Sequence, residues 1–202
     1  MKQQRRGILS KQAVLQAALC EFALQGYGNV TVDLICSTYN LSKGMVYHYC
    51  TGKDDLFLRC ARQVFSDLAD TLQKEIHIPA GTTFEKMIED YYLCRQRFFE
   101  KRQQELIFFQ SVMLSPPPHL QQEVENLRSP LKEINRHLFS TALEICSDPC
   151  KIHKEDALRY LETIKKVFWK IVVEFTGTNS VKGIETEKQQ GLLLKMLLHG
   201  IF

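Results

Sequence analysis

A short stretch of the chain concentrates side chains that donate hydrogen bonds. Residues 42–50 read SKGMVYHYC, and Lys53 follows three residues later. Hydroxyls, ammonium groups, phenols and imidazoles are the groups with which proteins contact phosphate oxygens and base edges. A small residue such as Gly44 lets the backbone approach a partner closely. The chemistry expected of this stretch is therefore the binding of a polyanion, not the cleavage of a bond.

The rest of the sequence offers no arrangement typical of catalysis. It contains no Ser/His/Asp set, paired-carboxylate motif or phosphate-binding loop, so we expect no enzyme and no cofactor. His119, His137 and His153 are too dispersed to predict a metal site. The seven cysteines are odd in number and form no CxxC pair, which predicts reduced, mostly buried thiols and a cytoplasmic location. Cys146 and Cys150, four residues apart, leave a thiol sensor as an alternative.

Composition places the chain among ordinary globular proteins. Of its 202 residues, 45% are hydrophobic and 24% are charged. No apolar run approaches the roughly 18 residues of a membrane helix, and the basic N-terminus lacks the apolar segment of a signal peptide. Residues 1–53 contain six Lys or Arg and two Asp or Glu, a net charge of +4, so the remainder carries −1 of the total +3. This asymmetry indicates an anionic partner at one end.

The polar stretch must be positioned by short helices. Apolar residues at helical spacing predict a first helix, with Ser10 as its N-cap and Gly26 at its end. Thr31 is expected to cap a short second helix. Asn40 tolerates the left-handed backbone of a tight turn, after which Ser42 would cap a third helix over 43–49. Two short helices joined by a short turn predict a helix-turn-helix.

The third helix has the dimensions of a helix that binds in the major groove of DNA. Seven residues span roughly 10 Å and fit a major groove about 12 Å wide. Its first turn would meet base edges, with Met45 and Tyr49 packed inward. We expect the DNA contacts to include Val46 on a thymine methyl, and Tyr47 and His48 on phosphates. The contacts predicted from these residues are Ser42, Lys43, Gly44, Val46, Tyr47, His48 and Lys53. The alternative is a polar helical turn with buried tyrosine rings.

The remaining segments also have helical period, and no strand pattern or internal repeat is present. Thr51 and Asp54 have the spacing of a capping box that would open a fourth, long helix. Pro130 should kink or split the helix predicted between 120 and 138. The predicted domains are 1–52 for the helix-turn-helix, 53–78 for a connecting helix and 79–202 for a larger helical body.

Two functions are predicted for this body. Aromatic residues at 84–114 could line an apolar pocket, although aromatics at helical spacing also occur as plain core; the candidate pocket residues are Tyr91, Tyr92, Phe98, Phe109, Met113 and Trp169. The segments 157–175 and 186–201 carry more apolar surface than one neighbour covers. They predict a dimer interface with Leu161, Phe168, Leu193, Met196 and Leu197, or else central helices of a monomer.

Residues 14–60 resemble the DNA-binding region of the tetracycline-repressor-type (TetR) family of transcriptional regulators. The resemblance rests on ALCEFALQGY at 18–27, TVDLI at 31–35, LSKGMVYHY at 41–49 and a Lys-Asp-x-Leu step at 53–56. Asn40 stands where the family usually has glycine, and Cys50 where it usually has phenylalanine.

The resemblance implies an all-α homodimer with an N-terminal three-helix DNA head and a C-terminal domain for ligand binding and dimerisation. It also implies a transcriptional regulator, more often a repressor, that binds a near-palindromic double-stranded DNA operator and responds to a small-molecule effector. The DNA contacts that the resemblance implies are Thr31, Ser42, Lys43, Gly44, Val46, Tyr47, His48 and Lys53. An all-helical enzyme or protein adaptor that retains the head is the rival interpretation.

Overall fold

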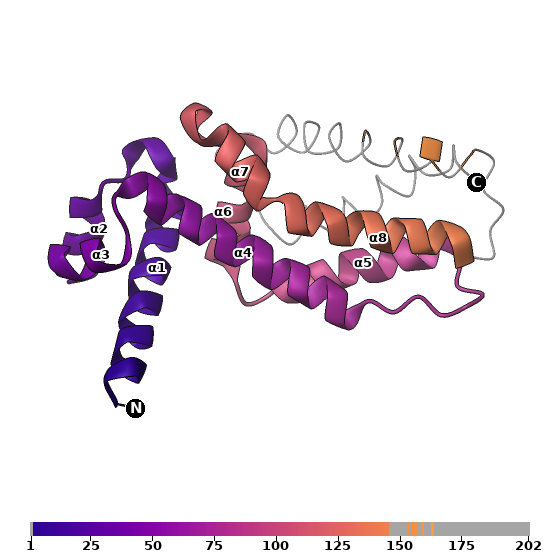
Figure 1. The fold of residues 1–202 in the computed structure, drawn as a ribbon, viewed down its shortest axis with the longest axis horizontal. Helices are drawn as coiled ribbons and strands as arrows, with labels where there is room; N and C mark the ends of the chain where they lie inside the picture. The colour runs from indigo at the N-terminus through magenta and orange to yellow at the C-terminus, as the bar shows by residue number, and fades with distance from the viewer. Residues whose placement is uncertain (1, 146–152, 154, 157–158, 160–162, 164–202) are drawn as a thin grey trace. The chain divides into compact units, whose positions relative to one another are not determined.

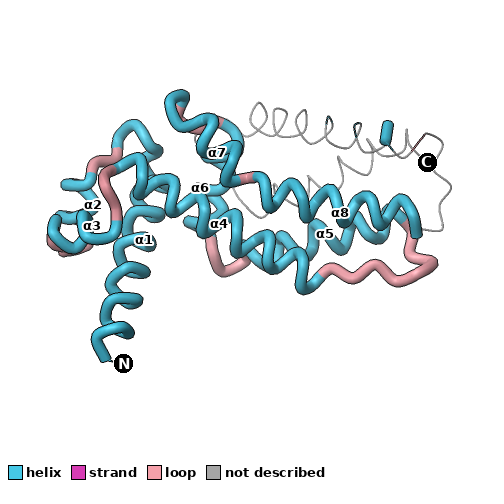
Figure 2. The backbone as a smooth tube through the Cα atoms, viewed as in Figure 1, coloured by secondary structure: helices cyan, strands magenta, loops and turns pink. Residues whose placement is uncertain are grey.

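The computed structural model describes residues 2–145, 153, 155–156, 159 and 163. Every regular element among them is a helix, as Figure 2 shows by its colouring, so the predicted all-α class is confirmed for this part of the chain. The elements in Figure 1 are α1 (Lys2–Asn29), α2 (Val32–Thr38), α3 (Lys43–Tyr49), α4 (Lys53–Glu75), α5 (Phe84–Phe99), α6 (Gln103–Leu114), the 3-10 turn η1 (Pro118–Leu120), α7 (Gln121–Leu127) and α8 (Ser129–Ile145).

The chain divides into two compact units. The first comprises residues 1–65 and 104–128, and the second comprises 66–103 and the described residues from 129 onward. Helix α4 begins in the first unit and ends in the second. The domain boundaries predicted after residues 52 and 78 remain predictions.

Helix α1 begins earlier than the sequence predicted. It starts at Lys2, so the expected N-cap at Ser10 is wrong, and Ser10 lies within the helix. The predicted break at Gly26 is confirmed, because Gly26 has φ 73° and ψ 160° inside an otherwise helical run. Only glycine adopts this conformation without steric cost, and it redirects the short segment that ends at Asn29.

The core of the first unit contains one apolar stripe from each of its first four helices. Fully buried members are Val14, Ala18 and Phe22 of α1, Ile35 of α2, Val46 of α3, and Leu56 and Cys60 of α4. Phe22 meets Phe57 edge-on at 5.2 Å between ring centroids, and Phe57 meets Phe108 of α6 at 5.3 Å. Such aromatic contacts hold α6 against the first and fourth helices.

The second unit is organised by α5 and α8. Tyr91 lies 5.5 Å from Phe139 between ring centroids, and its hydroxyl donates to Asn135 Oδ1 at 2.9 Å. The split expected at Pro130 is confirmed, since α7 ends at Leu127 and α8 begins at Ser129. Proline is tolerated in the first turn of a helix, where its missing N–H would have no intrahelical partner.

Candidate nucleic-acid interface

Local hydrogen bonds set the helix-turn-helix formed by α2 and α3. Thr31 Oγ1 accepts from the Leu34 N–H at 3.1 Å, and Ser42 Oγ accepts from the Met45 N–H at 3.1 Å. Both predicted N-caps are thereby confirmed. Between the helices Asn40 has φ 52°, the left-handed conformation expected of it. These three residues set the start of each helix and the turn that joins them.

Most of the predicted contact residues lie together on the outside of this motif. Ser42, Lys43 and Gly44 at the start of α3 are exposed, as are Tyr47 and His48 one turn later. Tyr47 is 53% exposed, which is unusual for so large a ring and leaves its phenol available to a partner. Thr31 is exposed at the start of α2, although its hydroxyl already caps that helix.

Val46 is the exception among these residues. Its side chain is 0% exposed, so the expectation that it faces outward and meets a thymine methyl is wrong. The inward packing predicted for Met45 and Tyr49 is partial, since both are half-buried. The Tyr49 hydroxyl donates to the backbone carbonyl of Gly7 at 2.9 Å. Val46 therefore belongs to the core that holds α3 in place.

Lys43 is held by an acidic residue on the neighbouring helix. Its Nζ lies 2.9 Å from each carboxylate oxygen of Asp33, which stands in the first turn of α2. The two side chains are 62% and 67% exposed. Hydrogen bonding to Asp33 and its negative charge raise the pKa of the Lys43 ammonium. The ammonium group of Lys43 on α3 is thus already paired with a carboxylate.

A second polar cluster joins the end of α1 to the start of α4. The Tyr27 hydroxyl donates to Asp54 Oδ1, and His119 Nε2 of η1 lies 3.1 Å from the Tyr27 hydroxyl and 3.2 Å from Asp54 Oδ2. Burial, and then the hydrogen bond to Asp54, raise the pKa of Tyr27 to about 12. Lys53 Nζ lies 4.1 Å from the centroid of the Tyr27 ring. Lys53 is therefore half-buried and positioned by this ring.

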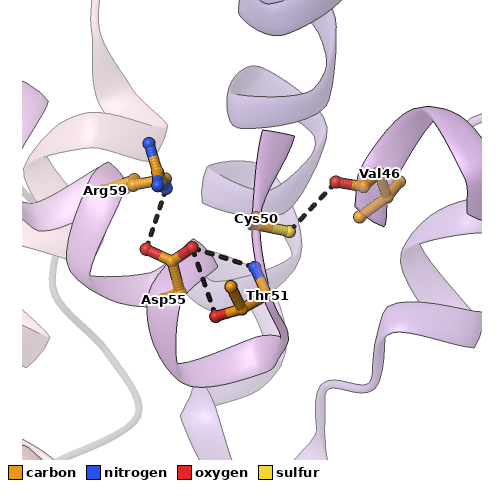
Figure 3. A network of polar contacts seen from close by, with 5 residues as sticks. All are labelled: Val46, Cys50, Thr51, Asp55 and Arg59. Carbon is orange, nitrogen blue, oxygen red and sulfur yellow. Dashed lines mark hydrogen bonds and ion pairs between the residues drawn. The ribbon is translucent and has the colours of Figure 1, made fainter. Parts of the chain in front are cut away.

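Asp55 caps the start of α4, where the sequence predicted Asp54 (Figure 3). The Thr51 N–H donates to Asp55 Oδ2 at 2.9 Å, so Asp55, and not Asp54, reaches back across the turn. Arg59 Nε donates to the other oxygen of Asp55 at 2.8 Å. Although burial opposes the charge, these hydrogen bonds lower the pKa of Asp55. On the α3 side, the Cys50 thiol donates to the Val46 carbonyl at 3.2 Å.

The predicted pocket residues lie in several places. Tyr91 and Phe98 are buried in the second unit and Tyr92 is half-buried there, whereas Phe109 is buried and Met113 half-buried in the first unit. Trp169 lies outside the described residues. A depression of about 400 Å³ in the second unit is lined by Ile76, His77, Ile78, Pro79, His137, Leu138 and Thr141, none of which was predicted. The pocket assignment remains a prediction.

The predicted dimer residues all lie outside the described part of the chain; they are Leu161, Phe168, Leu193, Met196 and Leu197. Among the described residues, no cluster of His, Cys, Asp or Glu has the geometry of a metal site. The described cysteines are free thiols, and burial raises the pKa of Cys60 and of Cys94. No described helix is long and apolar enough to cross a membrane.

Sequence reasoning missed three residues that shape this interface. Asp33 lies ten residues from Lys43 in sequence, a spacing that does not reveal the ion pair. His119 lies 65 residues from Asp54 in sequence, so no local pattern could have connected them. Tyr27 could have been flagged only as an aromatic between two glycines.

Comparison with known proteins identifies this architecture. Residues 14–60 match the family model of bacterial regulatory proteins of the tetR family. No curated protein matches the chain in a sequence search. Many solved structures do match it in fold.

Three of these structures illustrate the likeness. A tetR family transcription regulator from Shewanella sp. PV-4 superposes with TM-score 0.64 at 16% identity, over 95% of this chain and 97% of that one. The fatty acid degradation regulator FadR from Bacillus halodurans gives TM-score 0.67 at 13% identity, over 91% and 93%. The regulator PfmR from Thermus thermophilus gives 0.63 at 15%, over 92% and 97%. The chain thus carries the N-terminal domain of the TetR family on the fold of that family's transcription regulators.

Proposed function

We propose that the chain is a ligand-responsive transcriptional regulator that binds a near-palindromic DNA operator as a homodimer. The observation that carries the proposal is the exposed row on α3, in which Ser42, Lys43 and Gly44 open the helix and Tyr47 and His48 follow one turn later. Such a row suits the first turn of a helix in the major groove, with flanking donors on phosphates. The matched family model covers these same residues.

Within this proposal each residue has a role that fits its surroundings. Lys43 lies where a recognition helix approaches base edges, while Tyr47 and His48 would donate to phosphates. Thr31 would contact a phosphate at the start of α2. Lys53, oriented by the Tyr27 ring, would contact a second phosphate beside the start of α4.

The regulatory part of the proposal rests on α4. This helix has 23 residues, about 35 Å, and it runs from Lys53 in the first unit to Glu75 in the second. A small apolar or aromatic effector in the second unit would displace α4 and change the spacing of two heads. A coupling of about 1–3 kcal/mol changes DNA affinity about 5–150-fold, which suffices for release of a repressor.

DNA binding is tested with duplexes that the full-length protein selects from a random-sequence library. Lys43→Ala and Tyr47→Ala should each weaken binding about tenfold or more in fluorescence anisotropy, since each removes a direct contact. The matched control is Lys86→Ala, which removes an exposed, ion-paired lysine of α5. Unchanged affinity in both head variants would contradict the assigned interface.

Salt dependence separates a DNA reader from a protein adaptor. The logarithm of the binding constant should fall linearly with the logarithm of salt concentration, by about 0.9 for each neutralised phosphate. Lys53→Ala, which removes one such contact from each head of a dimer, should make the slope shallower by roughly 1.8. Weak, salt-independent binding of every duplex would favour the adaptor.

The dimer and the effector need separate measurements. Sedimentation equilibrium should give twice the chain mass, and Leu193→Asp with Leu197→Asp should give the monomer if those residues form the interface. A library of small apolar and aromatic compounds should contain members that raise the melting temperature and release the selected duplex. A monomeric wild type, or tight binders without effect on DNA affinity, would contradict these parts of the proposal.

A further inference from the structure

The ion pair between Asp33 and Lys43 lies on the surface proposed to meet DNA. Residues 31–49, which comprise the cap of α2, both short helices and the turn, contain one Lys, one Asp and one His. With the histidine neutral, the formal charge of this segment is zero. A surface that binds a polyanion would ordinarily be cationic, so the carboxylate of Asp33 opposes the expected function.

Folding stability does not account for this arrangement. Both side chains are more than half exposed, and exposed ion pairs contribute little to the stability of a fold. Asp33 also lies in the first turn of α2, where a negative charge interacts favourably with the helix dipole. That effect requires only an acid near the helix start, and it does not require the bidentate contact with Lys43.

We infer that Asp33 is a specificity-determining residue that positions Lys43 and opposes binding to DNA whose bases place no acceptor within reach of the held Lys43 ammonium. The inference rests on the proposed DNA-binding function and assigns a role that the predicted contacts did not include.

The donor geometry of the ammonium group explains how the pair would read a base. A lysine ammonium has three N–H donors, and the two oxygens of Asp33 occupy at most two of them. At least one donor remains for a single acceptor, such as O6 or N7 of guanine in the major groove. Because Asp33 holds the flexible lysine side chain, this donor is presented with less loss of rotamer freedom on binding.

The same pair penalises binding to unmatched sequences. On such DNA no base acceptor lies where the free donor of the held Lys43 points. Lys43 then gains a DNA contact only by turning away from Asp33 toward a phosphate. The carboxylate would then stand unneutralised beside the phosphates expected near Thr31, two residues away, where like charges repel. On a matched duplex Lys43 contacts the base while it remains paired with Asp33, so this penalty does not arise. Discrimination between operator and other DNA therefore increases.

The test compares two duplexes, one selected from a random-sequence library by the wild-type protein and one with the same bases shuffled. Asp33→Asn should tighten binding to the shuffled duplex about fivefold and leave the selected duplex within about twofold. The discrimination ratio should fall accordingly. Asp33→Glu, which keeps the charge, should retain most of the ratio, and thermal melting should show that both variants are folded.

A matched control and a second background sharpen the result. Asp90→Asn neutralises an aspartate of α5 that is paired with Lys86 at 2.8 Å and is 43% exposed, and it should alter neither affinity. In a Lys43→Met background, Asp33→Asn should change both duplexes by the same factor, because no lysine remains to be positioned. A loss of discrimination that persists there would mean that Asp33 reads DNA directly, and it would overturn the inference.

Failure of the inference differs from failure of the proposed function. If the wild type discriminates between the duplexes but Asp33→Asn keeps the wild-type ratio, Asp33 has no role in specificity and the DNA-binding proposal stands. If the wild type shows no discrimination in the first place, the proposed function fails and the inference fails with it.

Discussion

Replacement of Gln110 by methionine should stabilise the protein. Gln110 lies on α6 with 2% of its surface exposed, and neither Nε2 nor Oε1 of its amide has a hydrogen-bond partner among the described residues. Burial of an unpaired amide costs about 1–3 kcal/mol in proteins. Methionine has a similar length and no polar hydrogen-bonding group, and its flexible side chain adapts to existing space. We expect Gln110→Met to raise the free energy of unfolding by about 1–3 kcal/mol.

Urea and thermal unfolding measure this change directly. For a chain of this size each kcal/mol shifts the melting temperature by about 2–4 °C. Gln122→Met is the matched control, because Gln122 is exposed on α7 and donates to Asn126 at 3.2 Å. Its effect should stay within about 0.5 kcal/mol of zero.

The refuting result is equally definite. If Gln110→Met lowers the free energy of unfolding by about 1 kcal/mol or more, the amide makes a favourable interaction in the native protein. The assignment of an uncompensated polar group would then be wrong. Unchanged stability would also refute the magnitude, since removal of an unpaired buried amide should be measurable.

Three further predictions concern the first unit. Tyr27→Phe removes the hydrogen bond to Asp54 and should cost about 0.5–1.5 kcal/mol in urea unfolding. The pKa of Tyr27 is about 12 in the fold against 10.0 for the free group, so the fold favours the neutral phenol. The free energy of unfolding of the wild type should therefore hold below pH 10 and fall as the pH rises toward 12. In Tyr27→Phe the part of this decrease that comes from Tyr27 should be absent. Asn40→Gly should raise the free energy of unfolding by about 0.5 kcal/mol, and Asn40→Ala should lower it by about 1 kcal/mol, because residue 40 has φ 52°; equal effects of both variants would contradict this. Val46→Ala should cost about 2–3 kcal/mol in chemical unfolding, since the side chain is fully buried, and a cost below about 0.5 kcal/mol would contradict that burial.

Features governed by local hydrogen bonding could be predicted from the sequence. Thr31 and Ser42 cap their helices because a side-chain oxygen satisfies an N–H that has no intrahelical partner. Asn40 and Gly26 mark changes of direction that few residue types tolerate. Each of these signals lies within about four residues of its consequence, so no knowledge of distant contacts is needed.

The orientation of α3 could not be predicted in the same way. Successive residues are about 100° apart around a helix, so a seven-residue helix has a buried arc defined by very few side chains. Met45 and Tyr49 were correctly placed near this arc, but its deepest position is Val46, one residue from Met45. Contacts with α1 and α2 decide which side of this arc is deepest, and short helices give little periodic evidence of it.

Long-range polar contacts were also beyond sequence reasoning. The approach of His119 to Tyr27 and Asp54 depends on how η1 packs against α1 and α4. Likewise, the pairing of Lys43 with Asp33 depends on the relative orientation of α2 and α3. The burial of Gln110 reflects the packing of α6, in which Leu106, Phe108, Phe109 and Val112 are buried with it.

The hydrogen bond from Tyr49 to Gly7 makes the two ends of this contact respond very differently to mutation. Since the acceptor is a main-chain oxygen, a new side chain at position 7 leaves it in place; a methyl group there would lie 3.9 Å from the phenol oxygen, an ordinary contact distance. The donor, in contrast, depends on a single atom, and Tyr49→Phe removes it. Evolutionary drift along the beginning of α1 can therefore proceed without releasing α3, while position 49 has no comparable freedom.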